Sequence, residues 1–267
     1  MSMVSIHTLS PTDLNNVKLI QPEGWPDIIP SFEFYLSSSF CTPIKAEHQG
    51  TIVGVGSAIC HGETGWLAHI IVHPEKRNLG IGKLITQSLI DILEKKNCST
   101  LLLLATALGE PVYKKAGFET DLKYLFFKHE TLKTESAVLT SHYTSGYEAA
   151  VLKLDRDTTG EDRGKLLMPH LPSCELIVSD NIVRGCYFKT LGEGLILAHD
   201  EEAGIALLNR KHEFLAKTAL PETNQAGISL LRQQGFEQFS QGTRMWRGKK
   251  LNWQSEKLYS RIGGNLG

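Results

Sequence analysis

The segment from residue 72 to residue 83 constrains the fold most, because it joins an apolar strand to an amphipathic helix through closely spaced glycines. It reads Val-His-Pro-Glu-Lys-Arg-Asn-Leu-Gly-Ile-Gly-Lys. The apolar run 66–72 predicts a strand, and the run 83–96 has apolar residues at helical spacing. A helix that begins directly after such a turn leaves main-chain N–H groups unpaired, and its dipole adds positive potential there. The sequence therefore predicts a phosphate or pyrophosphate site at this turn.

Two known kinds of phosphate-binding loop fit this turn poorly. A Walker loop ends in Gly-Lys followed by Ser or Thr, whereas Lys83 is followed by Leu84, which offers no hydroxyl for magnesium. A dinucleotide fingerprint has three glycines, whereas this turn has Gly80 and Gly82 led by an arginine. The order Arg77-Asn78-Leu79-Gly80-Ile81-Gly82 resembles the Arg-x-x-Gly-x-Gly loop of the GNAT acyltransferases. An ordinary strand-to-helix turn is the alternative interpretation.

A second motif follows at the distance that one helix and one strand would fill. The apolar run 101–105 predicts a buried strand. After it, Pro111 suits the first turn of a helix and Gly117 suits the end of that helix. The pattern of Tyr113 followed by Gly117-Phe118 resembles the tyrosine and Gly-Phe element of GNAT proteins. Together the two motifs extend the resemblance over residues 1–130.

The predicted order of elements is also similar to that of this family. Helices are expected to begin near Ser10, Ser31, Lys83 and Pro111. Strands are expected at 43–47, 51–60, 66–72, 101–105 and 124–128. The fold class is therefore α/β, a GNAT fold with a mixed central sheet, and a second, degenerate GNAT-like α/β domain is expected to follow it.

The expectation of a second domain rests on an internal repeat. Residues 224–236 align without a gap on 106–118, which places Gly235-Phe236 on Gly117-Phe118 and Leu231 on Tyr113. The segment 197–206 lies where an anion loop would be, but it has no arginine and carries extra acids. We therefore expect an acetyltransferase domain at 1–130 and an acetyltransferase-like domain without a CoA loop at 135–267. A chance match of two helices ending in Gly-Phe is the alternative.

The resemblance implies acetyl-CoA as cosubstrate, bound where the strand 66–72 separates from the strand 101–105. The pantetheine arm would pair with the main chain of Ile70, Ile71 and Val72, as an added strand does. The hydroxyl of Thr106 would bind the pantetheine amide, and Tyr113 would protonate the departing thiolate. A main-chain N–H near Ile71 would polarise the thioester carbonyl. The pyrophosphate would bind the loop residues Arg77, Asn78, Leu79, Gly80, Ile81, Gly82 and Lys83.

The resemblance does not identify the group that takes the proton of the attacking amine. Some GNAT members have a glutamate six residues before the valine of the loop, and that position is Trp66 here. The nearby candidates are His61, Glu63 and His69, each of which is equally explained by a turn or by packing. A water chain or an amine of low pKa would also serve. Aromatic side chains at Trp25, Phe34 and Tyr35 lie in the segment that covers the acceptor pocket in this family, although core packing also explains them.

Composition narrows the class of protein. The formal net charge of −1 argues against a large nucleic-acid surface, and no apolar stretch approaches the length of a membrane span. Five cysteines lack Cys-x-x-Cys spacing, and the histidines lack paired spacing, so we expect reduced thiols, no metal site and a cytoplasmic location. Asp155 and Arg163 are expected to form a helix cap and a structural ion pair.

The leading hypothesis is an acetyl-CoA-dependent N-acetyltransferase that acts on a primary amine of a small molecule or an amino terminus. The alternative is a CoA-binding sensor or pseudoenzyme without turnover, which the missing base motivates. A protein-interaction module that docks through its second half is a third hypothesis. No nucleic acid or membrane partner is expected, and a homodimer is compatible with the sequence.

Overall fold

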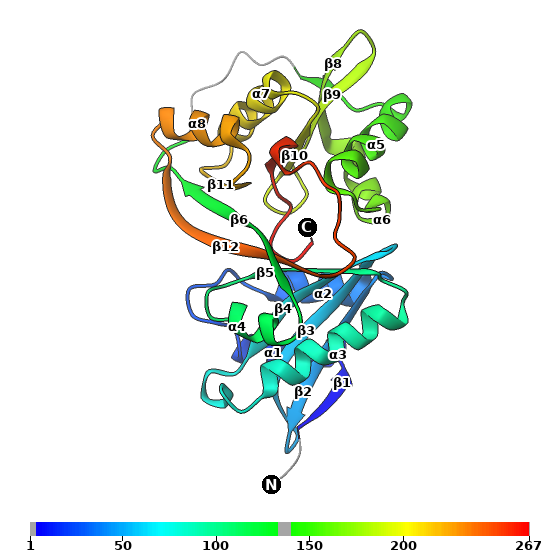
Figure 1. The fold of residues 1–267 in the computed structure, drawn as a ribbon, viewed down its shortest axis with the longest axis vertical. Helices are drawn as coiled ribbons and strands as arrows, with labels where there is room; N and C mark the ends of the chain where they lie inside the picture. The colour runs from blue at the N-terminus through cyan, green and yellow to red at the C-terminus, as the bar shows by residue number, and fades with distance from the viewer. Residues whose placement is uncertain (1–3, 133–139, 267) are drawn as a thin grey trace.

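The computed structural model describes residues 4–132 and 140–266 as two α/β halves that share strands and a core (Figure 1). The elements of the first half are β1 Ser5–Thr8, α1 Leu14–Leu19, α2 Ile29–Ser37, β2 Cys41–His48, β3 Thr51–His61, β4 Thr64–Val72, α3 Ile81–Lys95, β5 Thr100–Ala105, α4 Glu110–Lys115 and β6 Glu119–Lys128. Those of the second half are β7 Ser141–His142, α5 Glu148–Thr159, α6 Gly164–Leu167, β8 Cys174–Ser179, β9 Ile182–Phe188, β10 Leu195–Ala198, α7 Glu201–His212, β11 Lys217–Pro221, α8 Gln225–Gln233, β12 Glu237–Gly248 and β13 Leu258–Ser260.

The first sheet is mixed, as predicted, and has the strand order β1-β2-β3-β4-β5-β12-β6-β11. Strands β4 and β5 run parallel, while all other neighbours in it are antiparallel. The second sheet has the order β13-β10-β9-β8-β7. The predicted α/β class, with a mixed central sheet and a second α/β half, is therefore confirmed. The edge strand β1 was not predicted, because four residues carry too little pattern to separate a strand from a loop.

Helix α3 packs on β3 because β3 has glycines beneath it. A Cβ atom on Gly54 would stand 2.7 Å from Ile85 of α3, and one on Gly56 would stand 2.9 Å from the same side chain. The buried face of α3 repeats at helical spacing, as the sequence predicts, with Ile81, Ile85 and Leu89 on it. This close packing fixes the first turn of α3 against the end of β4, where the predicted anion loop lies.

Strands from the second half complete the first sheet. Strand β12 lies between β5 and β6 and pairs with both, from Thr243 opposite Ala105 to Glu237 opposite Lys128. Strand β11 then pairs with the other edge of β6. Figure 1 shows β12 leaving the end of α8 and then passing alongside β6 and β5.

One hydrophobic cluster also joins the two halves. It includes Phe32 and Trp66 from the first half with Leu154 and Leu176 from the second. The boundary at 130–135 stays a prediction of where one sequence unit ends. The sheet and the core continue across it, so the two units are not separate bodies.

Candidate active site

The loop between β4 and α3 has the free main-chain donors that an anion site needs. Among the described residues, none accepts a hydrogen bond from the amides of residues 78–83, and the first amide of the helix to pair is that of Leu84, with Gly80. The amide of Arg77 is different, because it donates to the carbonyl of Pro74 at 3.4 Å. Arg77 itself is exposed. The loop thus presents consecutive unpaired N–H groups at the positive end of a helix of 15 residues.

Two left-handed residues shape this loop. Asn78 has φ 63° and Gly80 has φ 81°, a region that glycine adopts freely and asparagine tolerates. Gly80 has no atom within 4 Å of the place where a Cβ would be, so its requirement is conformational and not steric. Gly82 lies in the first turn of α3, where only Val72 approaches an added Cβ, at 3.7 Å. Both glycines leave the outer surface of the loop bare.

Within residues 4–132 and 140–266, the edge of β4 that leads to the loop has no pairing strand on its β5 side. Strand β4 pairs with β5 only at Thr64–Trp66 opposite Thr100–Leu102. Beyond Trp66, β5 continues to pair with β12, while β4 follows β3. Ile70, Ile71 and Val72 lie on this separated part of β4, where their main chain can accept an added strand.

A β-bulge interrupts this separated part of β4. Val55 pairs with Ile71 and Ser57 pairs with Ala68, so that His69 and Ile70 together face the single residue Gly56. His69 has φ 45°, which is rare for a residue with a side chain. Such strain is retained mainly where surrounding structure enforces it, often at functional sites.

Tyr113 lies in α4 with its ring over Gly109. A Cβ on Gly109 would stand 2.8 Å from the ring and 3.4 Å from the hydroxyl oxygen of Tyr113. Phe118 packs against the same ring, edge to face, with centroids 6.2 Å apart. Burial raises the pKa of Tyr113 to about 12. Its hydroxyl has no hydrogen-bond partner among the described residues and is not fully enclosed, so it remains available to a ligand.

Thr106 follows β5 and opens the turn into α4. Its hydroxyl oxygen accepts a hydrogen bond from the amide of Gly109 at 3.3 Å, and its side chain is exposed. The oxygen therefore already serves the turn, while the hydroxyl proton is free to donate to a bound amide.

The three candidate bases have different surroundings. His61 and Glu63 flank the β3–β4 hairpin, at the end of β4 where β4 is still paired with β5. His61 is buried against Phe40, and burial lowers its pKa to about 3, with a smaller contribution from the charge of Arg163. Glu63 is exposed. Only His69 lies on the separated part of β4.

Sequence reasoning missed the partners of His69 and of Trp66. The hydroxyl of Tyr35 lies 2.6 Å from Nδ1 of His69, and Nδ2 of Asn265 donates to the same hydroxyl at 2.6 Å. The indole N–H of Trp66 donates to Oε2 of Glu161 at 2.7 Å. Asn265 and Glu161 belong to the second half. No local pattern in the sequence signals either contact.

The second half has the same kinds of elements as the first half, but its helix N-terminus and its strand edge are occupied by the protein itself. Asp200 caps α7, accepts from the amide of Ala203 at 3.0 Å and pairs with Arg184, so a carboxylate of the protein occupies this helix N-terminus. Strand β13 pairs with β10 and packs against β11, where the first half leaves its parallel strands separated. Gly235 has φ 79°, close to the 83° of Gly117, as the repeat suggests.

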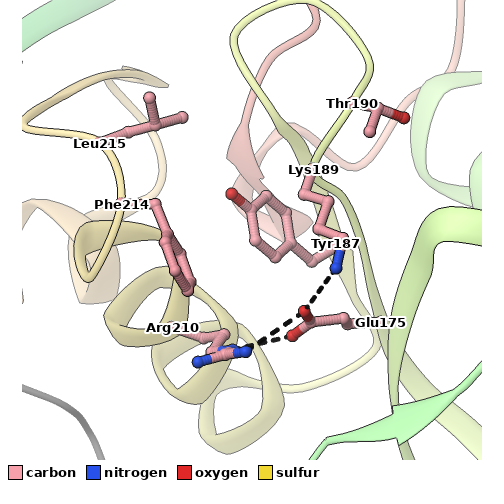
Figure 2. A pocket seen from close by; sticks show the side chains of 7 residues that line it. All are labelled: Glu175, Tyr187, Lys189, Thr190, Arg210, Phe214 and Leu215. Atoms are coloured by element: carbon pink, nitrogen blue, oxygen red, sulfur yellow. Dashed lines mark hydrogen bonds and ion pairs between the residues drawn. The ribbon is translucent and has the colours of Figure 1, made fainter.

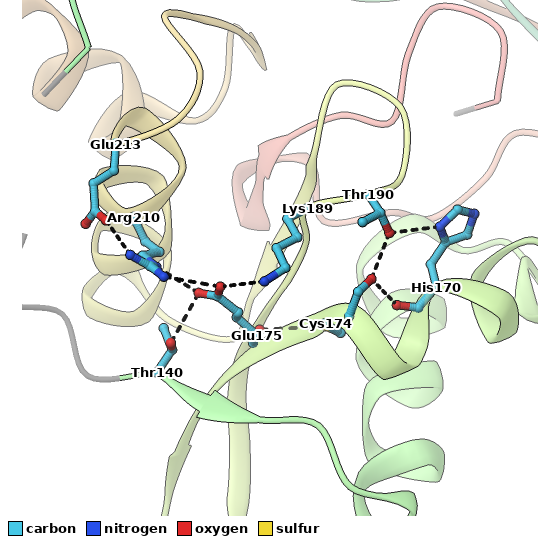
Figure 3. Close-up of polar contacts among 9 residues, drawn as sticks. Thr140, His170, Cys174, Glu175, Lys189, Thr190, Arg210 and Glu213 are labelled. Atoms are coloured by element: carbon cyan, nitrogen blue, oxygen red, sulfur yellow. Dashed lines mark hydrogen bonds and ion pairs between the residues drawn. The ribbon is translucent and has the colours of Figure 1, made fainter. Parts of the chain in front are cut away.

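A hollow of about 330 Å³ in the second half has a lining whose charges pair with one another (Figure 2). Glu175 is buried between Lys189, at 3.2 Å, and Arg210, at 2.9 Å. Arg210 also pairs with Glu213 and stacks over Phe214. Figure 3 shows that Thr140 adds a further hydrogen bond to Glu175. Since Glu175 is satisfied by Lys189, Arg210 and Thr140, this network is explained by the stability of the fold.

No cluster of histidine, cysteine and acidic side chains within residues 4–132 and 140–266 could hold a metal ion. Within the same ranges, no helix is long and apolar enough to cross a membrane.

This chain is similar in sequence or in fold to several known proteins. A Bacillus subtilis (strain 168) protein named a "putative acetyltransferase" is 27% identical over 108 residues, which are 40% of this chain and 74% of that protein. A Pyrococcus horikoshii crystal structure has the same fold over 99% of this chain and 96% of its own, with a TM-score of 0.84 and 19% identity. A tandem GNAT protein from the clavulanic acid biosynthesis pathway is similar over 94% of this chain and all of its own, with a TM-score of 0.60 and 13% identity.

Two segments match family descriptions directly. Residues 40–120 match a family model described as "Acetyltransferase (GNAT) domain", and residues 151–260 match a second family model with the same description. The first segment contains the loop and Tyr113, and the second contains the repeat. This chain therefore belongs to the GNAT acetyltransferases, with two such domains in tandem.

Proposed function

We propose that the first half transfers the acetyl group of acetyl-CoA to a primary amine of a small molecule or an amino terminus. The observation that carries the proposal is the row of unpaired amides at residues 78–83 beside the unpaired edge of β4. The row supports binding of a pyrophosphate, and the edge supports pairing with the two amides of a pantetheine arm. CoA carries both groups, in this order.

In the proposed complex the loop residues bind the pyrophosphate and the main chain of Ile70, Ile71 and Val72 binds the pantetheine. A main-chain N–H near Ile71, on the side of β4 that has separated from β5, polarises the thioester carbonyl. Thr106 donates its free hydroxyl proton to a pantetheine amide. Arg77 adds positive charge at the outer side of the loop.

The reaction then proceeds by direct attack. The amine nitrogen bonds to the thioester carbon, and the C–S bond breaks as the carbonyl re-forms. Tyr113 gives its proton to the departing thiolate, which leaves as the CoA thiol. The nitrogen loses one proton to solvent, and solvent restores the proton of Tyr113. Because burial raises the pKa of Tyr113 to about 12, its hydroxyl is protonated and ready to donate at neutral pH.

The second half is proposed to hold the first half in shape and not to bind CoA. Two observations support this role. Asp200 occupies the N-terminus of α7 that would bind a pyrophosphate, and its negative charge would repel one. Strand β13 also lies against β10, so that edge is already paired.

One observation favours a second candidate, a CoA-binding sensor without turnover. Of the three candidate bases, His61 and Glu63 lie at the paired end of β4, away from the proposed thioester. A sensor needs no base, whereas an enzyme must accept an amine that loses its proton by other means.

Calorimetric titration with acetyl-CoA and a thiol-release assay separate these functions. The enzyme should bind acetyl-CoA at micromolar concentration and release CoA thiol faster with at least one class of primary amine than with buffer alone. The amine panel includes polyamines, amino sugars, amino acid amides and short peptides. Tight binding without amine-dependent release would favour the sensor, and undetectable binding would refute both.

A further inference from the structure

His69 is held by a chain of two hydrogen bonds that ends in the second half. Asn265 lies 230 residues from Tyr35 in sequence and donates its Nδ2–H to the Tyr35 hydroxyl oxygen. Tyr35 is 1% exposed and is packed against Phe32, so few acceptors are within reach of its hydroxyl proton. The remaining neighbour of that hydroxyl is Nδ1 of His69, at 2.6 Å.

The direction of these bonds decides which nitrogen of His69 carries hydrogen. Because an amide NH₂ only donates, the oxygen of Tyr35 accepts from Asn265 and its own proton points to Nδ1 of His69. Nδ1 is then an acceptor, and a neutral imidazole in this state carries its hydrogen on Nε2. Burial lowers the pKa of His69 to about 4, which keeps the ring neutral at physiological pH.

The Nε2–H of His69 is free to bind a ligand. No described residue forms a hydrogen bond with Nε2, and this atom is not among the fully enclosed polar atoms without a partner. The ring lies among Trp25, Phe32 and Tyr35, all on the face of the sheet away from α3. The left-handed conformation of His69 in the bulge places the ring there. The geometry therefore provides one fixed donor beside the separated part of β4.

We propose that the Nε2–H of His69 binds a carbonyl or carboxylate oxygen next to the acceptor amine, so that the acceptors are α-amino carbonyl compounds such as amino acids and peptide amino termini. This inference rests on the proposed acetyl transfer. It makes His69 a specificity-determining residue that contacts the acceptor and donates a hydrogen bond to it. It also means that His69 is not the base.

The same class of acceptor explains how the reaction proceeds without a base on the protein. The α-amino group of a peptide or an amino acid amide has a pKa of about 8, whereas an alkylamine resembles lysine at about 10.4. At pH 7.5 roughly a quarter of these peptide and amide amino groups are unprotonated, compared with roughly one in a thousand alkylamines. Among α-amino carbonyl compounds, the peptides and the amides therefore carry amines that are ready to attack.

A matched pair of substrates tests the donor role. Alaninamide and isopropylamine differ only in that a carboxamide replaces a methyl group. The wild-type protein, His69→Ala and His69→Gln are compared by kcat/KM for both amines. We expect His69→Ala to lower the alaninamide-to-isopropylamine ratio about tenfold, the worth of one hydrogen bond in a desolvated site. His69→Gln should restore most of the ratio, because its side-chain amide places a donor at a similar distance.

Asn265→Asp provides a test that leaves the ring in place. A carboxylate only accepts, so Tyr35 would turn its proton toward it and accept from Nδ1 of His69, which moves the hydrogen off Nε2. We expect this variant to lose the preference for alaninamide, as His69→Ala does. Nitrogen-15 NMR of the imidazole should show the Nε2–H form in the wild-type protein and the Nδ1–H form in the variant.

The outcomes distinguish failure of this inference from failure of the proposed function. Turnover with an unchanged substrate ratio in His69→Ala, or the Nδ1–H form in the wild-type protein, would overturn the donor role alone. An equal loss of kcat/KM for both amines in His69→Ala and His69→Gln would indicate that His69 acts as a base. That result would also overturn the donor role. A wild-type protein that binds acetyl-CoA but acetylates no amine would contradict the proposed function, and this inference with it.

Discussion

Trp66 of strand β4 donates its indole N–H to the carboxylate of Glu161 in the second half, at 2.7 Å, and both side chains are buried. Thr64 donates to the same carboxylate oxygen at 3.4 Å, and the buried ion pair of Arg163 with Asp155 lies nearby. The ion pair confirms the structural role expected for these residues, although Asp155 lies inside α5 and is not a cap.

Replacing Trp66 with Phe should destabilise the protein more than the same change at Trp246. Both tryptophans pack in the shared core, but the indole of Trp246 has no hydrogen-bond partner among the described residues. Trp66→Phe removes the shorter of the two hydrogen bonds to the buried Glu161 and leaves only that of Thr64, which costs about 1–3 kcal/mol beyond the lost packing. Urea denaturation of both variants measures the difference, and equal losses would show that this hydrogen bond adds nothing.

The pH dependence of stability should reveal the buried carboxyl of Glu161. Burial raises the pKa of Glu161, and the charge of Arg163 opposes this only in part. A raised pKa contributes stability below the ordinary pKa of glutamate, and this stability is lost as the pH rises through the raised value. Glu161→Gln should therefore become relatively more stable than the wild-type protein as the pH increases. Unfolding curves for the two proteins at several pH values would contradict this if they differed by a constant amount.

Tyr113→Phe should lower kcat roughly 100-fold and leave the dissociation constant of acetyl-CoA unchanged, since a general acid contributes at this scale or above. The raised pKa of Tyr113, about 12, also predicts that kcat does not fall through ionisation of this group below about pH 10. Tyr143→Phe is the control, because that hydroxyl donates to Glu148 in the second half. Unchanged kcat in Tyr113→Phe would remove the residue from the mechanism.

Gly82→Ala should stabilise the fold while it weakens binding of acetyl-CoA. Gly82 lies inside α3, where alanine is favoured by about 0.5–1 kcal/mol, and an added Cβ meets only Val72 at 3.7 Å. The same methyl group stands where the pyrophosphate would approach the amides. Ser88→Ala, farther along α3, should improve stability in the same direction without any effect on binding. Thermal denaturation and calorimetry test both, and tighter binding by Gly82→Ala would argue against a phosphate at this loop.

Native thiol titration should detect one fast-reacting cysteine. All the cysteines are free, and Cys60 is half-buried whereas the others are buried. Burial raises the pKa of its neighbour Cys98 to about 12, which suppresses the reactive thiolate there. We expect Cys60→Ser to remove the fast phase with Ellman's reagent, and denaturant to expose the remaining thiols. A fast phase that survives in Cys60→Ser would contradict the burial of the others.

The first half should not fold alone. Strand β6 pairs only with β11 and β12, both from the second half, so a fragment of residues 1–132 leaves β6 without a partner. We expect this fragment to lack cooperative thermal unfolding, and co-expression with residues 140–267 to restore it. The control is the full chain with a protease site inserted within 133–139, which should remain associated after cleavage. A fragment 1–132 that unfolds cooperatively would refute the dependence.

The sequence was informative where structure follows from local pattern. The glycines of the loop, the periodicity of α3 and the turn at Gly117 are short-range signals, and each predicted element is present. The insertion of β12 between β5 and β6 was not predictable, because nothing near residue 240 specifies which distant strand it joins. The contacts of His69 were hidden for the same reason. Its positive φ depends on the register of β4 against β3, and Asn265 reaches it from the far end of the chain.

Because β12 lies between β5 and β6, the first sheet can be completed only late in synthesis of the chain. Residues 119–128 leave the ribosome long before residues 237–248, and at usual elongation rates the interval is on the order of ten seconds. During that time the exposed edges of β5 and β6 can pair with other nascent chains. We expect the yield of native protein to depend on translation speed and on chaperones that shield strand edges, even though the finished molecule is well packed.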